Sequence, residues 1–313
     1  MTGSEAGFSL PELLISITIF LVISGVVTQA LLQMTNSQRT IWNRTQMHSG
    51  VRSATELLQQ EVGQAGRISL PYTTTLGAAV AAGAQTVGVN QVTPGGTVAS
   101  VAGIFQGEQL TIDAGDNQET VAITAVSTAG KTITGVFTVA HAAGAPIMVL
   151  GGFANGIVPL APGFVNGSTV NLLKLFGDIN GDGNMVYIEY KCDTAAGKLY
   201  RNVMAYDAVA KAAPTSSQIL LGNILANPDG TGCFIYEPNP LPVVGVTTYV
   251  LDVAITLTVQ TQTKDPITNL FQTETKALLN VSPRNVFNVW QLASAGITNR
   301  VQPMPLSVTN LLP

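Results

Sequence analysis

The stretch that decides the architecture runs from Phe8 to Val27 and reads FSLPELLISITIFLVISGVV. Glu12 is its single charged residue, and the next charge along the chain is Arg39. An α-helix rises about 1.5 Å per residue, so about 20 apolar residues span the hydrocarbon core of a bilayer. The stretch therefore predicts a membrane-spanning helix close to the amino terminus.

A helical pattern continues well beyond this apolar run. The spacing between its apolar residues is mostly three, four or seven, which is typical of one face of a helix. These residues are Leu31, Met34, Ile41, Met47, Val51, Ala54, Leu57, Leu58, Val62 and Ala65. We expect one helix over residues 8–66, about 80 Å long, that ends near Gly66 ahead of Pro71.

The composition excludes several classes of protein. Only 10% of the 313 residues are charged, against roughly 25% in an ordinary soluble domain. The net charge of −4 leaves no basic surface, so we predict no nucleic-acid partner. A hydrophobic content of 46% is too high for disorder driven by charge. What remains is a chain with one membrane anchor and a weakly charged, β-rich body.

Two β-rich regions follow the helix. The first, residues 71–162, carries strand-like runs at 109–113, 120–126, 132–139 and 146–150, separated by turn residues. The second, residues 163–313, carries them at 185–191, 199–205, 232–236, 249–260 and 273–281. Apolar alternation in the second region predicts an antiparallel sheet with one buried face, packed on the helix. The expected fold class is α+β, with an all-β module inserted between helix and head.

Residues Gly7 to Glu12, at the start of the apolar run, read GFSLPE. This segment resembles the type IV prepilin cleavage and methylation motif, and with it the α+β pilin-like fold. The resemblance implies that prepilin peptidase removes residues 1–7 as a leader, cutting after Gly7, and methylates the new amino terminus at Phe8. It also implies that Glu12 pairs with a neighbouring subunit's amino terminus during assembly. A buried carboxylate and a buried amine are each costly alone, which favours such pairing.

Glu12 has a second interpretation, because the helix dipole stabilises a carboxylate in the first helical turn. The leader also departs from the prepilin pattern, since it carries Glu5 and no Lys or Arg. The first basic residues, Arg39 and Arg44, follow the apolar run, against the positive-inside rule. This distribution of charge argues against Met1 as the start of translation more than it argues against the motif.

Short motifs in the last region narrow the resemblance. Residues 186–190 read VYIEY and residues 197–201 read GKLYR, which is a Tyr-bearing strand, a Gly turn and a Leu-x-Arg strand. This pair resembles a hairpin of the PilW-like and J-type minor pilins. Phe234-Ile235-Tyr236 and Pro283-Arg284-Asn285 are similar to the next core strand and the closing segment of those proteins. Residues 71–162 have no counterpart in that pattern.

One loop matches a calcium-binding pattern. Residues 178–189 read DINGDGNMVYIE and satisfy D-x-[DN]-x-[DN]-G-x₅-E. The side chains of Asp178, Asn180, Asp182 and Glu189, with the backbone carbonyl of Asn184, would supply the hard oxygens that Ca²⁺ prefers. The strand that follows, and the preference of Asp, Asn and Gly for turns, favour a plain polar turn instead. Ca²⁺ is the one cofactor that the sequence suggests.

The chain has two cysteines, Cys192 and Cys233, both at the ends of strands expected in the head. Export to an oxidising compartment favours a disulfide between them. Closing a loop of about 40 residues is worth roughly 3–4 kcal/mol in the chain-entropy account. Two separate buried thiols are the alternative, and the absence of C-x-x-C spacing argues against a metal site.

The sequence therefore predicts a structural protein and not an enzyme. The resemblance implies a subunit of a type IV pilus, held in the inner membrane with its head in the periplasm and extracellular after assembly. The large head with its inserted β-module favours a low-copy minor subunit with a place near the filament tip. The resemblance also implies other pilin subunits, prepilin peptidase and the pilus assembly machinery as partners. Two alternatives stay open. One is a J-type pseudopilin of a type II secretion system, and the other is an anchored adhesin or ligand-binding module that uses residues 71–162.

Overall fold

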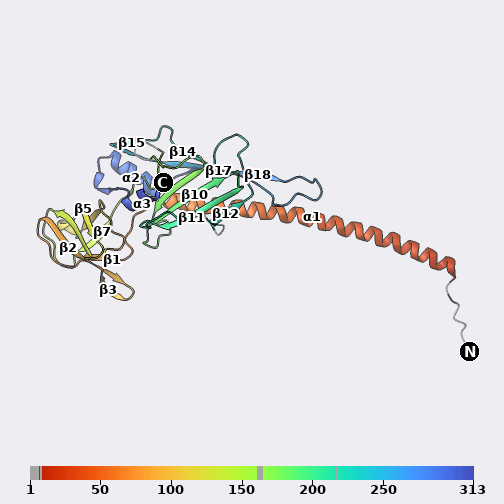
Figure 1. Ribbon diagram of the computed structural model, residues 1–313, viewed down its shortest axis with the longest axis horizontal. Helices are drawn as coiled ribbons and strands as arrows, with labels where there is room; N and C mark the ends of the chain where they lie inside the picture. Colours follow the sequence, from red (N-terminus) through yellow and green to blue (C-terminus); the bar gives the residue numbers. More distant parts are fainter. Residues whose placement is uncertain (1–6, 8, 161–164, 214, 216–217) are drawn as a thin grey trace, which may run out of the picture. The chain divides into compact units, whose positions relative to one another are not determined.

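The computed structural model describes residues 7, 9–160, 165–213, 215 and 218–313 (Figure 1). The chain divides into two compact units. The first combines the amino-terminal part up to Gly50 with Gln260–Glu274, and the second holds Val51–Val259 and Thr275–Pro313. The helix α1 (Leu10–Gln64) contributes to both units.

The helix α1 is 55 residues long and confirms the helix expected over residues 8–66. Of the helices in the described ranges, it alone is long and apolar enough to cross a membrane. The helix ends where Gly66 takes a left-handed φ of +80°. A Cβ at this position would lie 2.9 Å from the carbonyl oxygen of Phe153, so glycine permits both the helix end and the close approach of a neighbouring segment.

The inserted region forms a closed antiparallel sheet. Its strands are β1 (Thr73–Leu76), β2 (Gly83–Thr93), β3 (Gly96–Ala99), β4 (Gln109–Ile112), β5 (Glu119–Ser127), β6 (Thr132–Phe137) and β7 (Pro146–Val149). The order is β1-β7-β4-β5-β6-β2-β3, and β1 also pairs β2, which closes a barrel. The long strand β2 pairs β6 with its first half and β1 and β3 with its second half. Leu110, Ile112, Ile123 and Ile133 fill the barrel core.

The head is built from two further antiparallel sheets. One has the order β12-β11-β10-β9, with strands β9 (Leu172–Gly177), β10 (Val186–Asp193), β11 (Lys198–Ala205) and β12 (Ile219–Gly222). The other has the order β13-β17-β14, with β18 also on β17, and its strands are β13 (Ile224–Leu225), β14 (Phe234–Glu237), β17 (Asp252–Gln260) and β18 (Thr273–Val281). A long apolar helix followed by antiparallel sheets and a barrel is the expected α+β pilin-like fold.

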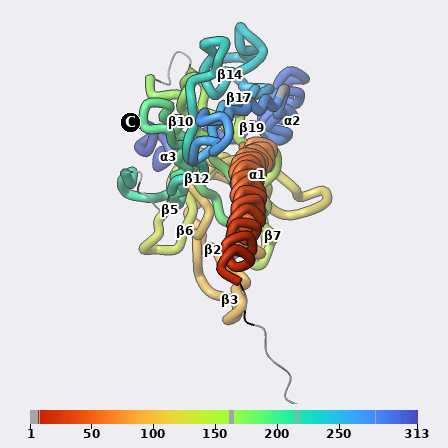
Figure 2. The backbone as a smooth tube through the Cα atoms, turned by 90° about the vertical axis from the view of Figure 1, so that its right-hand side faces the viewer, coloured from red at the N-terminus to blue at the C-terminus, as the bar shows by residue number. Residues whose placement is uncertain are grey.

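The structure adds elements that the sequence did not predict. The segment Pro283-Arg284-Asn285 follows the last predicted strand, β18, and opens the helix α2 (Arg284–Ser294), which the sequence did not predict. Its buried residues Val286, Val289 and Ala293 follow helical spacing. Figure 2 shows α2, β14 and β17 on the opposite side of the second unit from β5 and β6. Shorter additions are α3 (Leu306–Leu311), the 3₁₀ turns Gly115–Asn117 and Thr298–Arg300, and the strand pair β15 (Val243–Val244) and β16 (Thr247–Thr248).

The last part of the inserted region packs with the head rather than with the barrel. The strand β8 (Gly152–Phe153) pairs in parallel with β19 (Val301–Gln302), close to the carboxyl end of the chain. Phe153 also packs against Phe176 of β9, with ring centroids 4.7 Å apart and the rings tilted by 49°. Gln302 bonds the backbone of Gln109 in β4 through both its amide nitrogen and its amide oxygen. These contacts join the barrel to the head within the second unit.

Candidate functional site: the processing segment and the helix–head junction

The processing segment precedes the first turn of α1. Gly7 is exposed, and Phe8 lies outside the described residues. Ser9 comes directly before the helix, and its backbone N–H and its hydroxyl both donate to Glu12 Oε2, at 3.4 and 3.2 Å. The Ser-x-x-Glu spacing is that of a capping box, in which the glutamate satisfies a backbone donor left free at the helix start. In the single chain, Glu12 therefore has a local role in capping the start of the helix.

The first half of α1 exposes apolar side chains on all its faces. Leu13, Leu14 and Ile15 point in three directions around the helix, about 100° apart, and each is more than half exposed. A helix that is apolar all round is stable when lipid or other apolar helices surround it. The structure therefore contains a surface that fits both a membrane span and a bundle of like helices.

The second half of α1 is joined to the head by a buried ionic contact. Glu61 is 4% exposed and receives hydrogen bonds from the guanidinium of Arg201 and the hydroxyl of Tyr190. Tyr190 and Arg201 are directly opposite each other in β10 and β11, so both side chains leave the sheet on one face. Burial would lower the pKa of Arg201, but its contacts with Glu61 outweigh burial and raise it. Glu61, Tyr190 and Arg201 thus form a buried charged contact between helix and sheet, which we call the pin.

Sequence reasoning did not find the role of Glu61. The signal was present, because Glu61 lies three residues after Leu58 and seven after Ala54, on the face that packs inward. A carboxylate on an apolar helical face needs a buried partner. The residue that supplies it, Arg201, belongs to the Leu-x-Arg motif that the sequence had already singled out for its family resemblance.

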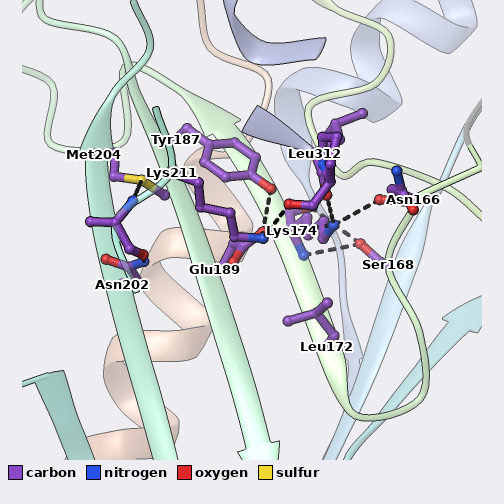
Figure 3. Close-up of polar contacts among 12 residues, drawn as sticks. Asn166, Ser168, Leu172, Lys174, Tyr187, Glu189, Asn202, Met204, Lys211 and Leu312 are labelled. Carbon is purple, nitrogen blue, oxygen red and sulfur yellow. Dashed lines mark hydrogen bonds and ion pairs between the residues drawn. The ribbon is translucent and has the colours of Figure 1, made fainter. Parts of the chain in front are cut away.

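A second buried cluster centres on Lys174 and Glu189 (Figure 3). The two face each other across β9 and β10, with Nζ and Oε1 3.7 Å apart. Glu189 Oε1 also accepts from the hydroxyl of Tyr187 at 2.6 Å and from Nζ of Lys211 at 2.5 Å. Lys174 Nζ donates to the backbone carbonyls of Asn166 and Leu312, so the cluster ties the end of the chain to the sheet. Burial lowers the pKa of Lys174.

Glu189 therefore does not point toward the loop that the calcium prediction assigned to it. Val186 pairs Gly177 at the loop end of the strands, and Glu189 lies three register steps further along β10. At about 3.4 Å per residue this places it roughly 10 Å along the strand. Calcium-binding loops of the matched type continue into a helix, whereas here a strand follows.

The other residues of the loop are held by bonds within the protein. Asp178 Oδ2 accepts from the hydroxyl of Ser69 at 2.8 Å and lies 3.5 Å from Nε of Arg67. Asp182 N–H donates to Asp178 Oδ1, and Asn184 N–H donates to Asp182 Oδ1. Within the described ranges, no group of three or more His, Cys, Asp or Glu side chains could hold a metal ion. Calcium binding stays a prediction, resting on the loop residues without Glu189.

The predicted disulfide is present. Cys192 in β10 is bonded to Cys233, which directly precedes β14, with their Cα atoms 6.4 Å apart. Both cysteines are buried. The bond links the two sheets of the head, since β10 and β14 belong to different sheets.

One charged cluster lies in the barrel. His141 is fully buried, and its Nδ1 lies 3.1 Å from Asp113 Oδ2 while its Nε2 lies 2.7 Å from Glu119 Oε1. Burial alone would lower the pKa of His141, but its hydrogen bonds to Glu119 and Asp113 outweigh burial and raise the pKa. The hydrogen bond from His141 lowers the pKa of Asp113. Burial of Glu119 works the other way, yet its bonds to Thr138 and His141 lower its pKa.

The barrel should therefore be most stable in mildly acidic solution. A histidine with a raised pKa stabilises the fold below its unfolded pKa, and this is lost as pH rises through the folded pKa. The carboxylates, with lowered pKa values, stabilise above their unfolded pKa, and this is lost as pH falls. The contribution is complete from roughly pH 4.5 to 6.5. In calorimetry of the full chain in detergent, the loss of melting temperature caused by His141→Gln should be largest in this window and shrink above it.

The matched control is His48→Gln, because His48 is the other histidine and lies on α1 outside the barrel. It should leave the pH profile of the barrel transition in place. If His141→Gln lowers the melting temperature equally at pH 5.5 and pH 9, the result would contradict a charged His141.

The amino-terminal segment also matches a known family model, that of the prokaryotic N-terminal methylation motif, over residues 3–28. Comparison with curated proteins and with solved structures finds no match. The matched range contains Gly7, Phe8 and Glu12, the three residues that carry the prepilin resemblance.

The match over residues 3–28 supports a type IV pilin-like protein. Its motif is of the prepilin type, which implies processing by prepilin peptidase and assembly with other pilins or pseudopilins. Proteins with this motif are structural subunits rather than enzymes, in agreement with the prediction from sequence. The motif and the apolar half of α1 together fit a membrane-anchored subunit that is later built into a filament.

Proposed function

We propose that this chain is a minor structural subunit of a type IV pilus. It is cut after Gly7, methylated at Phe8 and anchored in the inner membrane by α1, with its head in the periplasm. Assembly then moves α1 from lipid into a bundle of like helices. The observation that carries the proposal is the methylation motif at the start of a helix whose apolar side chains are exposed on every face.

The barrel supports a low-copy place near the tip. A filament made only of this chain would have to accommodate the barrel β1–β7 beside every head. A terminal subunit has fewer neighbours and places no such demand on packing. A J-type pseudopilin of a type II secretion system shares the motif. Deleting the gene distinguishes the two alternatives. Loss of protein export would indicate a pseudopilin, and loss of surface filaments would indicate a minor pilin.

Processing is the first test. Intact-mass spectrometry of the chain from membranes should show that it begins at a methylated Phe8. Gly7→Val should keep the leader attached, because a branched side chain replaces the glycine at the cleavage position. The matched control is Gly3→Val, which makes the same change within the leader and should be processed normally. A mature wild-type chain that still begins at Met1 would overturn the prepilin assignment.

Glu12 tests assembly. Glu12→Gln keeps an acceptor for the N–H of Ser9 but removes the charge, whereas Glu12→Ala removes both. If Glu12 pairs with a neighbour's amino terminus, both variants should be processed and both should enter filaments about tenfold less, equal to about 1.4 kcal/mol. Immunoblots of sheared filaments measure incorporation.

Ser9→Ala tests the helix-capping role of Glu12 separately from its pairing role. It removes the hydroxyl donor to Glu12 and leaves the carboxyl group of Glu12 in place. This variant should enter filaments nearly as the wild type does. Normal incorporation of Glu12→Gln with loss only in Glu12→Ala would instead assign Glu12 to helix capping.

A further inference from the structure

The first unit contains a loop that runs back along α1 toward the apolar half of the helix. This loop, Gln260–Glu274, connects β17 to β18. It is attached at its base by His48 with Glu274 and by Arg44 with Gln272. Toward its tip, Asn43 Nδ2 donates to the hydroxyl of Thr263 at 2.7 Å, and the hydroxyl of Thr40 donates to Asp265 Oδ1 at 3.1 Å. We call this segment the buttress loop.

The tip of the buttress loop is a well-bonded turn with apolar side chains on its outside. Asp265 is 5% exposed and accepts from the backbone N–H of Ile267 and from the side chain of Gln272. Its own backbone N–H and carbonyl bond Leu270 and Asn269. The turn thereby holds Ile267 and Leu270 outward, 66% and 67% exposed. Large apolar side chains held out by an ordered turn mark an interaction surface.

The exposed charged side chain of this tip is basic, and the buried Asp265 carries the opposite charge. Lys264 is exposed and lies 5.8 Å from the ring centre of Phe271, while Asp265 is turned inward to the bonds described above. Across a groove of about 740 Å³, the tip faces Arg39 and Trp42 of α1. Trp42 is 71% exposed. Basic residues with tryptophan and aliphatic side chains are the combination that proteins place at the lipid–water interface.

The position along the helix fits that interface. The groove beside the tip begins at Thr35, three residues after Leu32, where the apolar run is ending. Three residues of helix are about 4.5 Å long, and the polar layer of a bilayer is roughly 5–7 Å thick on each side. With Leu32 at the edge of the hydrocarbon, the Thr35 end of the groove lies in the headgroup layer, and Lys264 and Pro266 of the tip line the same groove. Side chains of α1 also lean toward the helix amino terminus, which brings Trp42 closer to the same layer.

We propose that the tip of the buttress loop docks on the headgroup layer of the membrane that anchors α1, with a preference for anionic lipid. Ile267, Leu270 and Phe271 enter the interface, and Lys264 and Arg39 bind lipid phosphates. The loop bonds to α1 from His48 to Thr40, so docking fixes the depth and rotation of the helix before assembly. This inference rests on the membrane anchoring in the proposed function.

The test places single tryptophans in the full-length chain, reconstituted at low density in vesicles that contain anionic phosphatidylglycerol and lipids brominated near the glycerol end. The background is Trp42→Phe with Trp290→Phe, and the reporter is Leu270→Trp. Phe20→Trp is the control inside the apolar run. Ser49→Trp is the control on the same helix, 14 residues beyond Thr35 and so about 21 Å further from the membrane.

We expect bromine quenching at position 270 to exceed that at position 49 by about threefold or more, since only the tip reaches the interface. Lys264→Glu should weaken this quenching in anionic vesicles and leave it unchanged in neutral ones. Equal quenching at 270 and 49, with Phe20→Trp quenched, would overturn the docking and leave the anchoring intact. An unquenched Phe20→Trp would overturn the anchoring itself.

A second copy of the chain is the competing occupant of this surface. Raising the protein density in the vesicle should leave quenching at position 270 unchanged if lipid covers the tip. Quenching that falls with density, together with cross-linking between copies at position 270, would assign the tip to a second copy and overturn the proposal.

Discussion

Glu61→Ala is expected to lower the free energy of unfolding of the second unit by about 3 kcal/mol. The variant leaves the guanidinium of Arg201, whose side chain is 27% exposed, and the hydroxyl of Tyr190 without their shared acceptor. Removing one partner of a buried charged pair is costly because the remaining charge is desolvated and unpaired. Urea unfolding of the full chain in detergent, followed through Trp290 fluorescence in a Trp42→Phe background, measures the loss.

Glu56→Ala is the matched control. Glu56 lies on the same helix and pairs with Arg52 four residues earlier, but both side chains are more than half exposed. Solvent screens such a pair, so this variant should leave the urea midpoint nearly unchanged. If Glu61→Ala and Glu56→Ala shift the midpoint equally, the pin between helix and head contributes nothing beyond a surface ion pair.

A compensating variant checks the physical reason. Glu61→Leu combined with Arg201→Met and Tyr190→Phe removes every buried polar group of the pin at once. A well-packed apolar replacement of a buried ionic cluster is often neutral for stability. The triple variant should therefore regain much of the stability lost in Glu61→Ala. Failure to regain any would show that packing volume, rather than the unpaired charge, dominates.

Removing the disulfide is expected to cost about 4 kcal/mol by the chain-entropy account, for a sequence separation of 41 residues. The double variant Cys192→Ala with Cys233→Ala avoids an unpaired thiol. Because the bond joins two sheets of the head, its loss releases both in the unfolded state. The same urea experiment measures the change.

Reductant provides the internal control. Dithiothreitol should lower the unfolding midpoint of the wild type to that of the double variant and leave the double variant unchanged. A wild-type midpoint that does not respond to reductant, with the protein shown by thiol labelling to be reduced, would mean that the bond does not stabilise the head.

The strands that sequence predicted correctly share a composition. The expected runs at 132–139 and 273–281 are β-branched or alternate in polarity, and β6 and β18 follow them closely. The strands β1, β2 and β9 were missed. The strand β2 reads GAQTVGVNQVT, in which glycine, alanine and glutamine dilute the signal. Its strand conformation comes from pairing with β1, β3 and β6, which is information held elsewhere in the chain.

The residues of the candidate site also divide into those that a local pattern predicts and those whose neighbours lie far away in the sequence. The roles of Gly7 and Glu12 are predicted from a local motif, and the disulfide, which the structure confirms, followed from two cysteines and an oxidising compartment. Glu189 was assigned to the wrong neighbours because the loop pattern presumes a helix after it. The strand β10 instead carries Glu189 to Lys174.

The sequence by itself determined the long apolar helix, the prepilin-type motif and the fold class, because each follows from composition, period or spacing within a short stretch. Only the tertiary structure decided where the buried charges pair. Glu61 and Arg201 are 140 residues apart, and His141 meets Asp113 and Glu119 from separate segments of a closed barrel. A buried charge must find a partner to offset its desolvation, but which partner it finds depends on strand register and barrel closure, which no local pattern encodes.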